Sequence, residues 1–171
     1  MVVSIDIGTS YSSICMLGLD GKAHPVDIST GASMFGSKFS LPSAVFVEDS
    51  GNVVVGQAAL NSRKRKPQNF YMGFKRNLGE NIPILLGERS FRPEELYIEL
   101  FRHMKARAEE VSGERVEKAF LTYPASYGKQ RKDKLCAAAR TAGLFDLDLV
   151  DEPTAAAMCY CAEGYVKDGQ T

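Results

Sequence analysis

The second half of the chain alternates between helix-like and strand-like segments, and this order restricts the fold more than any other feature. Apolar residues recur at steps of three and four from Pro93 to Gly113, which predicts a long amphipathic helix. The segments that follow are a strand at 118–123, a helix over 127–142, a strand at 147–150 and a helix over 152–162. Strands joined by single helices run parallel through right-handed crossovers. We therefore expect an α/β fold.

The first half adds three strands, followed by a region of short and irregular segments. Strand-like runs at 2–7, 12–19 and 22–28 are close enough in sequence to form an antiparallel meander, with Asp20-Gly21 as a hairpin signal. This predicts a mixed five-stranded sheet flanked by helices. A Gly- and Ser-rich loop follows over 29–40.

Short strands, a short helix with a basic end at 58–66, and scattered glycines fill the region from 39 to 91. We expect this region to be an inserted small α+β subdomain. Residues 1–38 and 92–171 would then form the main α/β subdomain.

Charge and cysteine usage exclude several classes of protein. Lys plus Arg and Asp plus Glu both total 21, so no global field attracts nucleic acid or a membrane surface. No run approaches the roughly 18 apolar residues of a membrane span, and Met1 leads directly into a strand pattern rather than a signal peptide. The expectation is a cytoplasmic globular protein. The four cysteines lack CxxC pairing, which favours buried or half-buried free thiols over disulfides or zinc.

Acidic residues fall at the ends of two strands of the predicted sheet. Asp6 ends the first strand, and Asp151-Glu152 follows the last one. Sites in open α/β sheets form beyond the carboxyl ends of strands, and carboxylates with water suit Mg²⁺. The turn at Gly8, Thr9 and Ser10 can cradle a phosphate with backbone N–H groups and hydroxyls. If the two strands are neighbours, Asp6 and Glu152 converge on one metal-bound triphosphate.

Each of these signals also has a purely structural interpretation. Asp6 in D-x-G-T can simply cap a tight turn, and Glu152 before a proline is good chemistry for a helix start. Lys75 beside Arg76 is typical of a solvated basic turn. The basic run at 63–66 is read as a solvated face rather than a nucleic-acid site, because the net charge is zero.

Several segments carry a family resemblance. In order they read "IDIGTSYSSI", "LPSAVFV", "VGQAALN", "PQNF", "FKRNLG", "RPEEL", "YPASYGKQR" and "VDEPTAAAMCY". Together they resemble the N-terminal lobe of the ATPase domain of the seventy-kilodalton heat-shock (DnaK-type) chaperones, which has the ribonuclease H-like, actin-like ATPase fold. The resemblance covers nearly the whole chain, and "EPTAAA" favours the chaperone branch over actins and sugar kinases.

The resemblance implies a role for each matching residue. Asp6 matches the acid that holds Mg²⁺ through water, and Lys75 matches the lysine that orients the γ-phosphate and the attacking water. Glu152 matches the acid that positions or activates this water. The residues that match the first phosphate loop of the ATP/ADP site are Gly8, Thr9, Ser10 and Tyr11. Pro124 and Arg131 resemble a pair that relays the nucleotide state to the substrate domain.

The resemblance also implies partners and a stress-response function. It implies a second ATPase lobe, a peptide-binding domain, a J-domain co-chaperone and a nucleotide exchange factor. Because the family clamps nucleotide between two lobes and this chain resembles only the first, we expect ATP hydrolysis when the second lobe is joined and negligible activity from this chain alone.

Three departures from the family pattern keep alternatives open. Asp151 replaces the usual asparagine. It adds a negative charge beside Glu152, and we expect this charge to disfavour the ionised form of Glu152. Arg131 lies one position early, with Lys132 in the expected place. The segment between "KRNLG" and "RPEEL" is short. The alternatives are a non-chaperone actin-like ATPase, such as a filament protein or a small-molecule kinase, and a nucleotide-sensing module without turnover.

Overall fold

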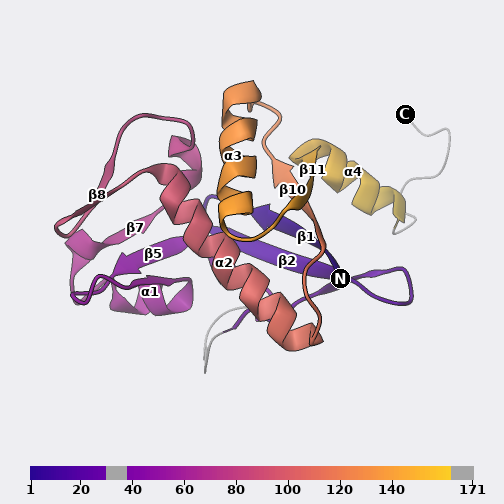
Figure 1. Ribbon diagram of the computed structural model, residues 1–171, viewed down its shortest axis with the longest axis horizontal. Helices are drawn as coiled ribbons and strands as arrows, with labels where there is room; N and C mark the ends of the chain where they lie inside the picture. Colours follow the sequence, from indigo (N-terminus) through magenta and orange to yellow (C-terminus); the bar gives the residue numbers. More distant parts are fainter. Residues whose placement is uncertain (30–37, 163–171) are drawn as a thin grey trace.

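The computed structural model describes residues 1–29 and 38–162, and Figure 1 shows the arrangement of its elements. The main sheet contains β1 (Val2–Ile7), β2 (Tyr11–Leu17), β3 (Ala23–Pro25), β4 (Leu41–Pro42), β10 (Lys118–Tyr123) and β11 (Asp146–Asp151). The helices are α1 (Gln57–Ser62), α2 (Pro93–Ser112), α3 (Lys129–Thr141) and α4 (Glu152–Ala162). Most of the predicted Gly- and Ser-rich loop lies outside the described residues, as does the segment after 162.

The strand order in the main sheet is β11-β10-β1-β2-β3. Strands β1, β2 and β3 are antiparallel neighbours, and β10 and β11 run parallel to β1. The sequence predicted five strands, but β4 also pairs with β2, so the sheet has six strands. A two-residue strand has no periodicity of its own, which is why the sequence pattern missed it.

Helix α2 forms where the sequence predicted it, because one stripe of its surface is apolar. Its buried residues are Pro93, Leu96, Tyr97, Leu100, Phe101, Met104 and Ala108. The Glu95 carboxylate accepts a hydrogen bond from the Arg92 N–H, and Gly113 ends the helix in the left-handed conformation with φ 71°. Val111, which the periodicity placed on the same stripe, is exposed instead.

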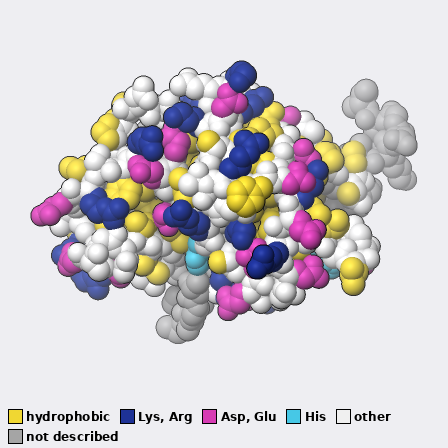
Figure 2. Space-filling model, in the orientation of Figure 1, with side chains coloured by type: hydrophobic (Ala, Val, Ile, Leu, Met, Phe, Trp, Pro, Cys, Tyr) yellow, Lys and Arg dark blue, Asp and Glu magenta, His cyan; other side chains and the backbone are white. Residues whose placement is uncertain are grey.

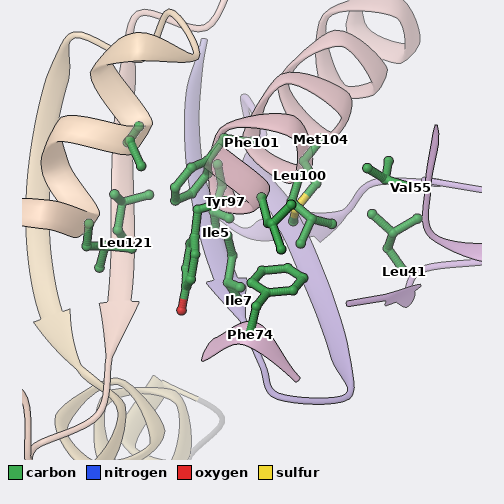
Figure 3. Packing of buried hydrophobic residues seen from close by; sticks show 14 of the residues in the cluster. Ile5, Ile7, Leu41, Val55, Phe74, Tyr97, Leu100, Phe101, Met104 and Leu121 are labelled. Carbon is green, nitrogen blue, oxygen red and sulfur yellow. The ribbon is translucent and has the colours of Figure 1, made fainter. Parts of the chain in front are cut away.

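Helices α2 and α3 cover one face of the sheet and enclose the core (Figure 1). Figure 3 shows this core, in which Ile5 and Ile7 of β1 face Tyr97 and Leu100 of α2. Phe74 packs edge-on against Tyr97, with ring centroids 5.3 Å apart. Gly143 ends α3 as predicted, because its N–H and that of Leu144 donate to the carbonyls of Arg140 and Ala139.

Apart from β4, which pairs with β2, the region from 39 to 91 forms two small sheets beside the main one. The first has the order β6 (Val53–Val55), β5 (Ala44–Val47), β7 (Phe70–Met72), and the second is the hairpin of β8 (Ile84–Leu86) and β9 (Arg89–Phe91). Two 3-10 turns, η1 (Pro67–Asn69) and η2 (Phe74–Asn77), flank β7. Most buried apolar residues of this region belong to the same cluster as those of the main sheet, so the two parts share a core. Ala44, Phe46 and Ala59 form a second, smaller cluster between the first small sheet and α1. Helix α1 ends at Ser62, before the basic run that the sequence placed at its end.

Helix α4 lies on the other face of the sheet. It contacts β10 and β11, and its Cys159 lies near Cys15 on β2. Burial raises the pKa of the Cys15 thiol, a hydrogen bond with Ser4 lowers it in part, and the nearby Cys159 raises it. The side chain of Cys15 alternates with that of buried Ile14, so it points away from the α2 face. All four cysteines are free, but Cys159 and Cys161 are exposed, contrary to the expectation of buried or half-buried thiols, because α4 has no buried residue.

Basic and acidic side chains are interspersed on the surface seen in Figure 2, in keeping with the formal net charge of zero. Within the described ranges, 1–29 and 38–162, none of the helices combines the length and the apolar character that crossing a bilayer requires.

Candidate functional site

The carboxylate of Asp6 lies at the carboxyl end of β1, beside the neighbouring strand β10. Ile5 of β1 is in register with Leu121 of β10, which places Thr122 of β10 next to Asp6. The Thr122 hydroxyl donates a hydrogen bond to Asp6 Oδ1. Thr122 could not be predicted from the sequence, because a single threonine in a strand gives no signal until the strand order is known.

The turn after β1 requires glycine at position 8. A Cβ atom at Gly8 would lie 2.2 Å from the carbonyl oxygen of Tyr11, so only glycine allows this close approach. Ser43, a buried residue that follows β4, forms two hydrogen bonds with this turn. Its hydroxyl donates to the Gly8 carbonyl at 2.7 Å, and its N–H donates to the Ser10 carbonyl at 2.8 Å. Ser43, in the segment "LPS" before β5, therefore fixes this loop through contacts that no local sequence pattern indicates.

Lys75 reaches the same place from the small-sheet region. It lies in η2, which begins after Gly73 in the left-handed conformation with φ 84°. Its ammonium Nζ lies 2.5 Å from Oε1 of Glu152, and the two residues are 77 positions apart in the chain. The Lys75 side chain is 12% exposed and that of Glu152 is 39% exposed, so the ion pair is only partly accessible to water.

Glu152 begins helix α4, directly after β11. The preceding residue, Asp151, caps this helix: its carboxylate accepts hydrogen bonds from the Thr154 N–H at 2.9 Å and the Thr154 hydroxyl at 2.8 Å. These two bonds lower the pKa of Asp151. Asp151 therefore has a structural role in fixing the start of α4. Its predicted influence on the ionisation of Glu152 stays a prediction.

These elements meet around one cleft of about 560 Å³. Its lining residues are Asp6, Gly8, Thr9, Lys75, Thr122, Glu152 and Ala155. The fold thus brings together five of the residues that the sequence singled out. Ser10 and Tyr11 belong to the loop but are not among the lining residues, and the Tyr11 side chain is 56% exposed.

The two residues expected to relay the nucleotide state lie outside the cleft lining. Pro124 directly follows β10, and its carbonyl accepts a hydrogen bond from the Tyr127 N–H. The Arg131 guanidinium lies over the Tyr127 ring, 5.5 Å from its centroid. At the neighbouring position, Lys132 donates to the Tyr123 hydroxyl at 3.3 Å.

The cleft suits a hydrated Mg²⁺ ion that accompanies phosphates. Carboxylate and hydroxyl oxygens line it together with one ammonium group. Within the part of the chain that the structure describes, no three His, Cys, Asp or Glu side chains cluster to form a protein cage for a metal. Mg²⁺ commonly binds through one or two carboxylates, water and substrate phosphates, so the donor set fits this ion.

Comparison with known proteins identifies the family. The family model described as "Hsp70 protein" matches residues 82–169, which is more than half of the chain. The chain belongs to the Hsp70 family. Its mixed α/β architecture fits an Hsp70 ATPase lobe, and the family match extends over α2, α3 and α4.

The Hsp70 chain is similar to several curated relatives named "Chaperone protein DnaK". The relative from Methanothermobacter thermautotrophicus is 31% identical over 93% of this chain, which corresponds to 26% of the relative. The relative from Elusimicrobium minutum is 34% identical over 93% of this chain and 25% of its own length, and that from Nitrosopumilus maritimus is 29% identical over 93% and 24%. The chain therefore spans about a quarter of the length of these relatives.

Proposed function

We propose that this Hsp70 chain is the first nucleotide-binding lobe of a DnaK-type chaperone ATPase that binds Mg-ATP and Mg-ADP. The observation that carries the proposal is the cleft in which Asp6, Lys75 and Glu152 meet at the glycine turn. A cation, two carboxylates and a loop that allows close backbone approach are the parts that phosphoryl transfer needs, because it depends mainly on positioning and charge neutralisation.

Each cleft residue has a distinct role in this proposal. Asp6 holds the hydrated Mg²⁺, and the Thr122 hydroxyl keeps the Asp6 carboxylate at the end of β1. A bound Mg²⁺ ion would neutralise negative charge on the phosphates. The loop that binds the terminal phosphates consists of Gly8, Thr9, Ser10 and Tyr11. Lys75 orients the γ-phosphate, and Glu152 positions or activates the attacking water.

In this proposal Lys75 changes its partner from Glu152 to a phosphate when nucleotide binds. The two charges neutralise each other at 2.5 Å in a partly buried position. An arriving phosphate replaces the carboxylate on the Lys75 ammonium and frees Glu152 to accept a hydrogen bond from water. Breaking the pair without this replacement would leave a partly buried charge uncompensated, which is unfavourable.

The remaining functional expectations belong to the same proposal. In the whole protein a second ATPase lobe would complete the site, and hydrolysis would control a peptide-binding domain with help from a J-domain co-chaperone and a nucleotide exchange factor. Pro124 and Arg131 would take part in that coupling. Residues 1–38 and 92–171 would form the phosphate-binding subdomain and 39–91 the smaller one, in a cytoplasmic protein. The chain alone would bind nucleotide weakly and not turn it over.

The test compares Lys75→Ala with Lys64→Ala in the whole protein. We expect calorimetry to show Mg-ATP binding by the native protein and single-turnover hydrolysis to fall about a hundredfold in Lys75→Ala, a typical loss for one preorganised charge-stabilising group. Lys64→Ala removes an exposed lysine from the basic run and should leave hydrolysis unchanged. Native-like hydrolysis by Lys75→Ala, or no Mg-ATP binding by the native protein, would refute the proposal.

A further inference from the structure

Lys75 is held at two different points of the residue. Glu152 pairs with its ammonium group, at the end of the side chain. Its backbone carbonyl accepts a hydrogen bond of 2.9 Å from the hydroxyl of Tyr127, which lies 52 positions later in the chain. The second contact fixes the backbone from which the side chain extends, so it acts on the direction in which the ammonium group can reach.

Tyr127 is itself firmly placed. Its side chain is buried, with 6% exposure, and it belongs to the main apolar cluster. Its N–H donates to the Pro124 carbonyl at 2.9 Å, which closes a tight turn between β10 and α3. The hydroxyl of Tyr127 therefore extends from this buried turn after β10 toward η2.

Arg131 contacts both Tyr127 and the segment that follows η2. Its guanidinium lies over the Tyr127 ring, and it also forms an ion pair of 3.9 Å with Glu80, just after η2. Tyr97 of α2 lies next to the Tyr127 hydroxyl on the buried side. Burial raises the pKa of Tyr97 well above its usual value, and the adjacent Tyr127 hydroxyl raises it further. Tyr97 therefore stays protonated and neutral beside this contact.

We propose that the Tyr127 hydroxyl is a positioning group for Lys75, and that it sets the direction of the Lys75 ammonium within the cleft. The hydroxyl does not line the cleft, so it acts through Lys75 and not on a ligand. The placement of Lys75 is independent of the proposed function, whereas its consequence for hydrolysis rests on that function.

Tyrosine and phenylalanine have the same ring, so Tyr127→Phe removes only the hydroxyl, together with its hydrogen bonds to the Lys75 carbonyl and the Tyr97 side chain. The loss leaves the Lys75 carbonyl without this donor, and a hydrogen bond of ordinary net strength corresponds to about a fivefold change in an equilibrium. Tyr123→Phe is the matched control. It removes a hydroxyl that contacts Lys132, also near the end of β10, and does not touch Lys75.

The first measurement needs no nucleotide. Hydrogen exchange followed by mass spectrometry should show the segment 73–79 exchanging about fivefold faster in Tyr127→Phe than in the native chain, while Tyr123→Phe matches the native chain. Arg131→Met keeps the aliphatic stem but removes the guanidinium, and it should accelerate the same segment by a smaller factor. Unchanged exchange of 73–79 in Tyr127→Phe would overturn the proposal.

The second measurement is single-turnover hydrolysis of Mg-ATP by the whole protein. We expect Tyr127→Phe to lower the rate of the chemical step about fivefold with unchanged affinity for Mg-ADP, because only the alignment of Lys75 is affected. A lower melting temperature with an unchanged hydrolysis rate would show a purely structural role and would overturn the positioning role. If the native protein hydrolyses no ATP but 73–79 responds as expected, the proposed function fails while the placement of Lys75 by Tyr127 stands.

Discussion

Helices α2 and α4 lie on opposite faces of the same sheet and are built on different principles. Helix α2 buries seven residues against the sheet and the small-sheet region, although its overall composition is strongly charged. Helix α4 is the more apolar of the two but has no buried residue, and its Met158 and Tyr160 are exposed. Apolar content alone therefore does not determine burial: α4 has the composition of a buried helix, yet the described part of the chain leaves it exposed.

The two helices therefore contribute differently: α2 contributes mainly to stability, and α4 contributes its first turn to the cleft. The packing of α2 stabilises the molecule through contacts spread along its length. The part of α4 that faces the cleft is its first turn, where Asp151 caps the helix and Glu152 reaches Lys75. We therefore expect truncation of a buried side chain in α2 to destabilise the chain, whereas truncation in the exposed part of α4 changes its stability little.

Truncation of Leu100 in α2 should have the largest effect on stability. Leu100 is fully buried, and removing such a side chain leaves a cavity, so we expect Leu100→Ala to lower the free energy of unfolding by about 3 kcal/mol. Met158→Ala in α4 is the matched change at a 62% exposed position and should stay within about 0.5 kcal/mol. Urea unfolding measures both. Equal losses would contradict the contrast between the two helices.

A smaller effect should appear as a pH dependence that originates in α2. Burial lowers the pKa of His103 from its usual value of 6.5, and the charge of nearby Arg107 lowers it further, while a hydrogen bond with the Ile28 backbone acts in the opposite direction. The unfolded chain then binds a proton at a higher pH than the folded chain. His103 therefore reduces stability as the pH falls from about 6.5 through its lower folded pKa.

We expect His103→Gln to lose less stability than the native chain between about pH 7 and about pH 5. Urea midpoints at the two pH values measure the difference. His24→Gln serves as the control, because His24 is exposed and pairs with Asp20 at the β2–β3 hairpin. If His103→Gln shows the same loss of stability between the two pH values as the native chain, His103 does not contribute to the pH dependence.

The sequence predicted the elements that depend on local patterns and missed those that depend on tertiary contacts. The period of α2 and the glycines after α2 and α3 were visible because each feature lies within one segment. Strand β4 was not, because its two residues are defined only by pairing with β2.

The candidate site follows the same rule. Asp6 and Glu152 were predicted from their positions at strand ends and Lys75 from the family resemblance. Thr122, Ser43 and Tyr127 instead make their contacts with residues far away in sequence. The exposure of Cys159 and Cys161 was also unpredictable, since the composition of α4 is that of a buried helix.

The central claim is that one cleft, between the glycine turn after β1 and the first turn of α4, binds the phosphates of a magnesium nucleotide. Titration of the isotope-labelled chain with Mg-ATP, followed by backbone-amide NMR, tests it most directly, because weak binding by a single lobe remains visible in the spectra. We predict saturable shifts at residues 8–11, 75 and 152. Shifts confined instead to the basic run at 63–66, or to the pocket between Asp49 and Arg89, would contradict the account.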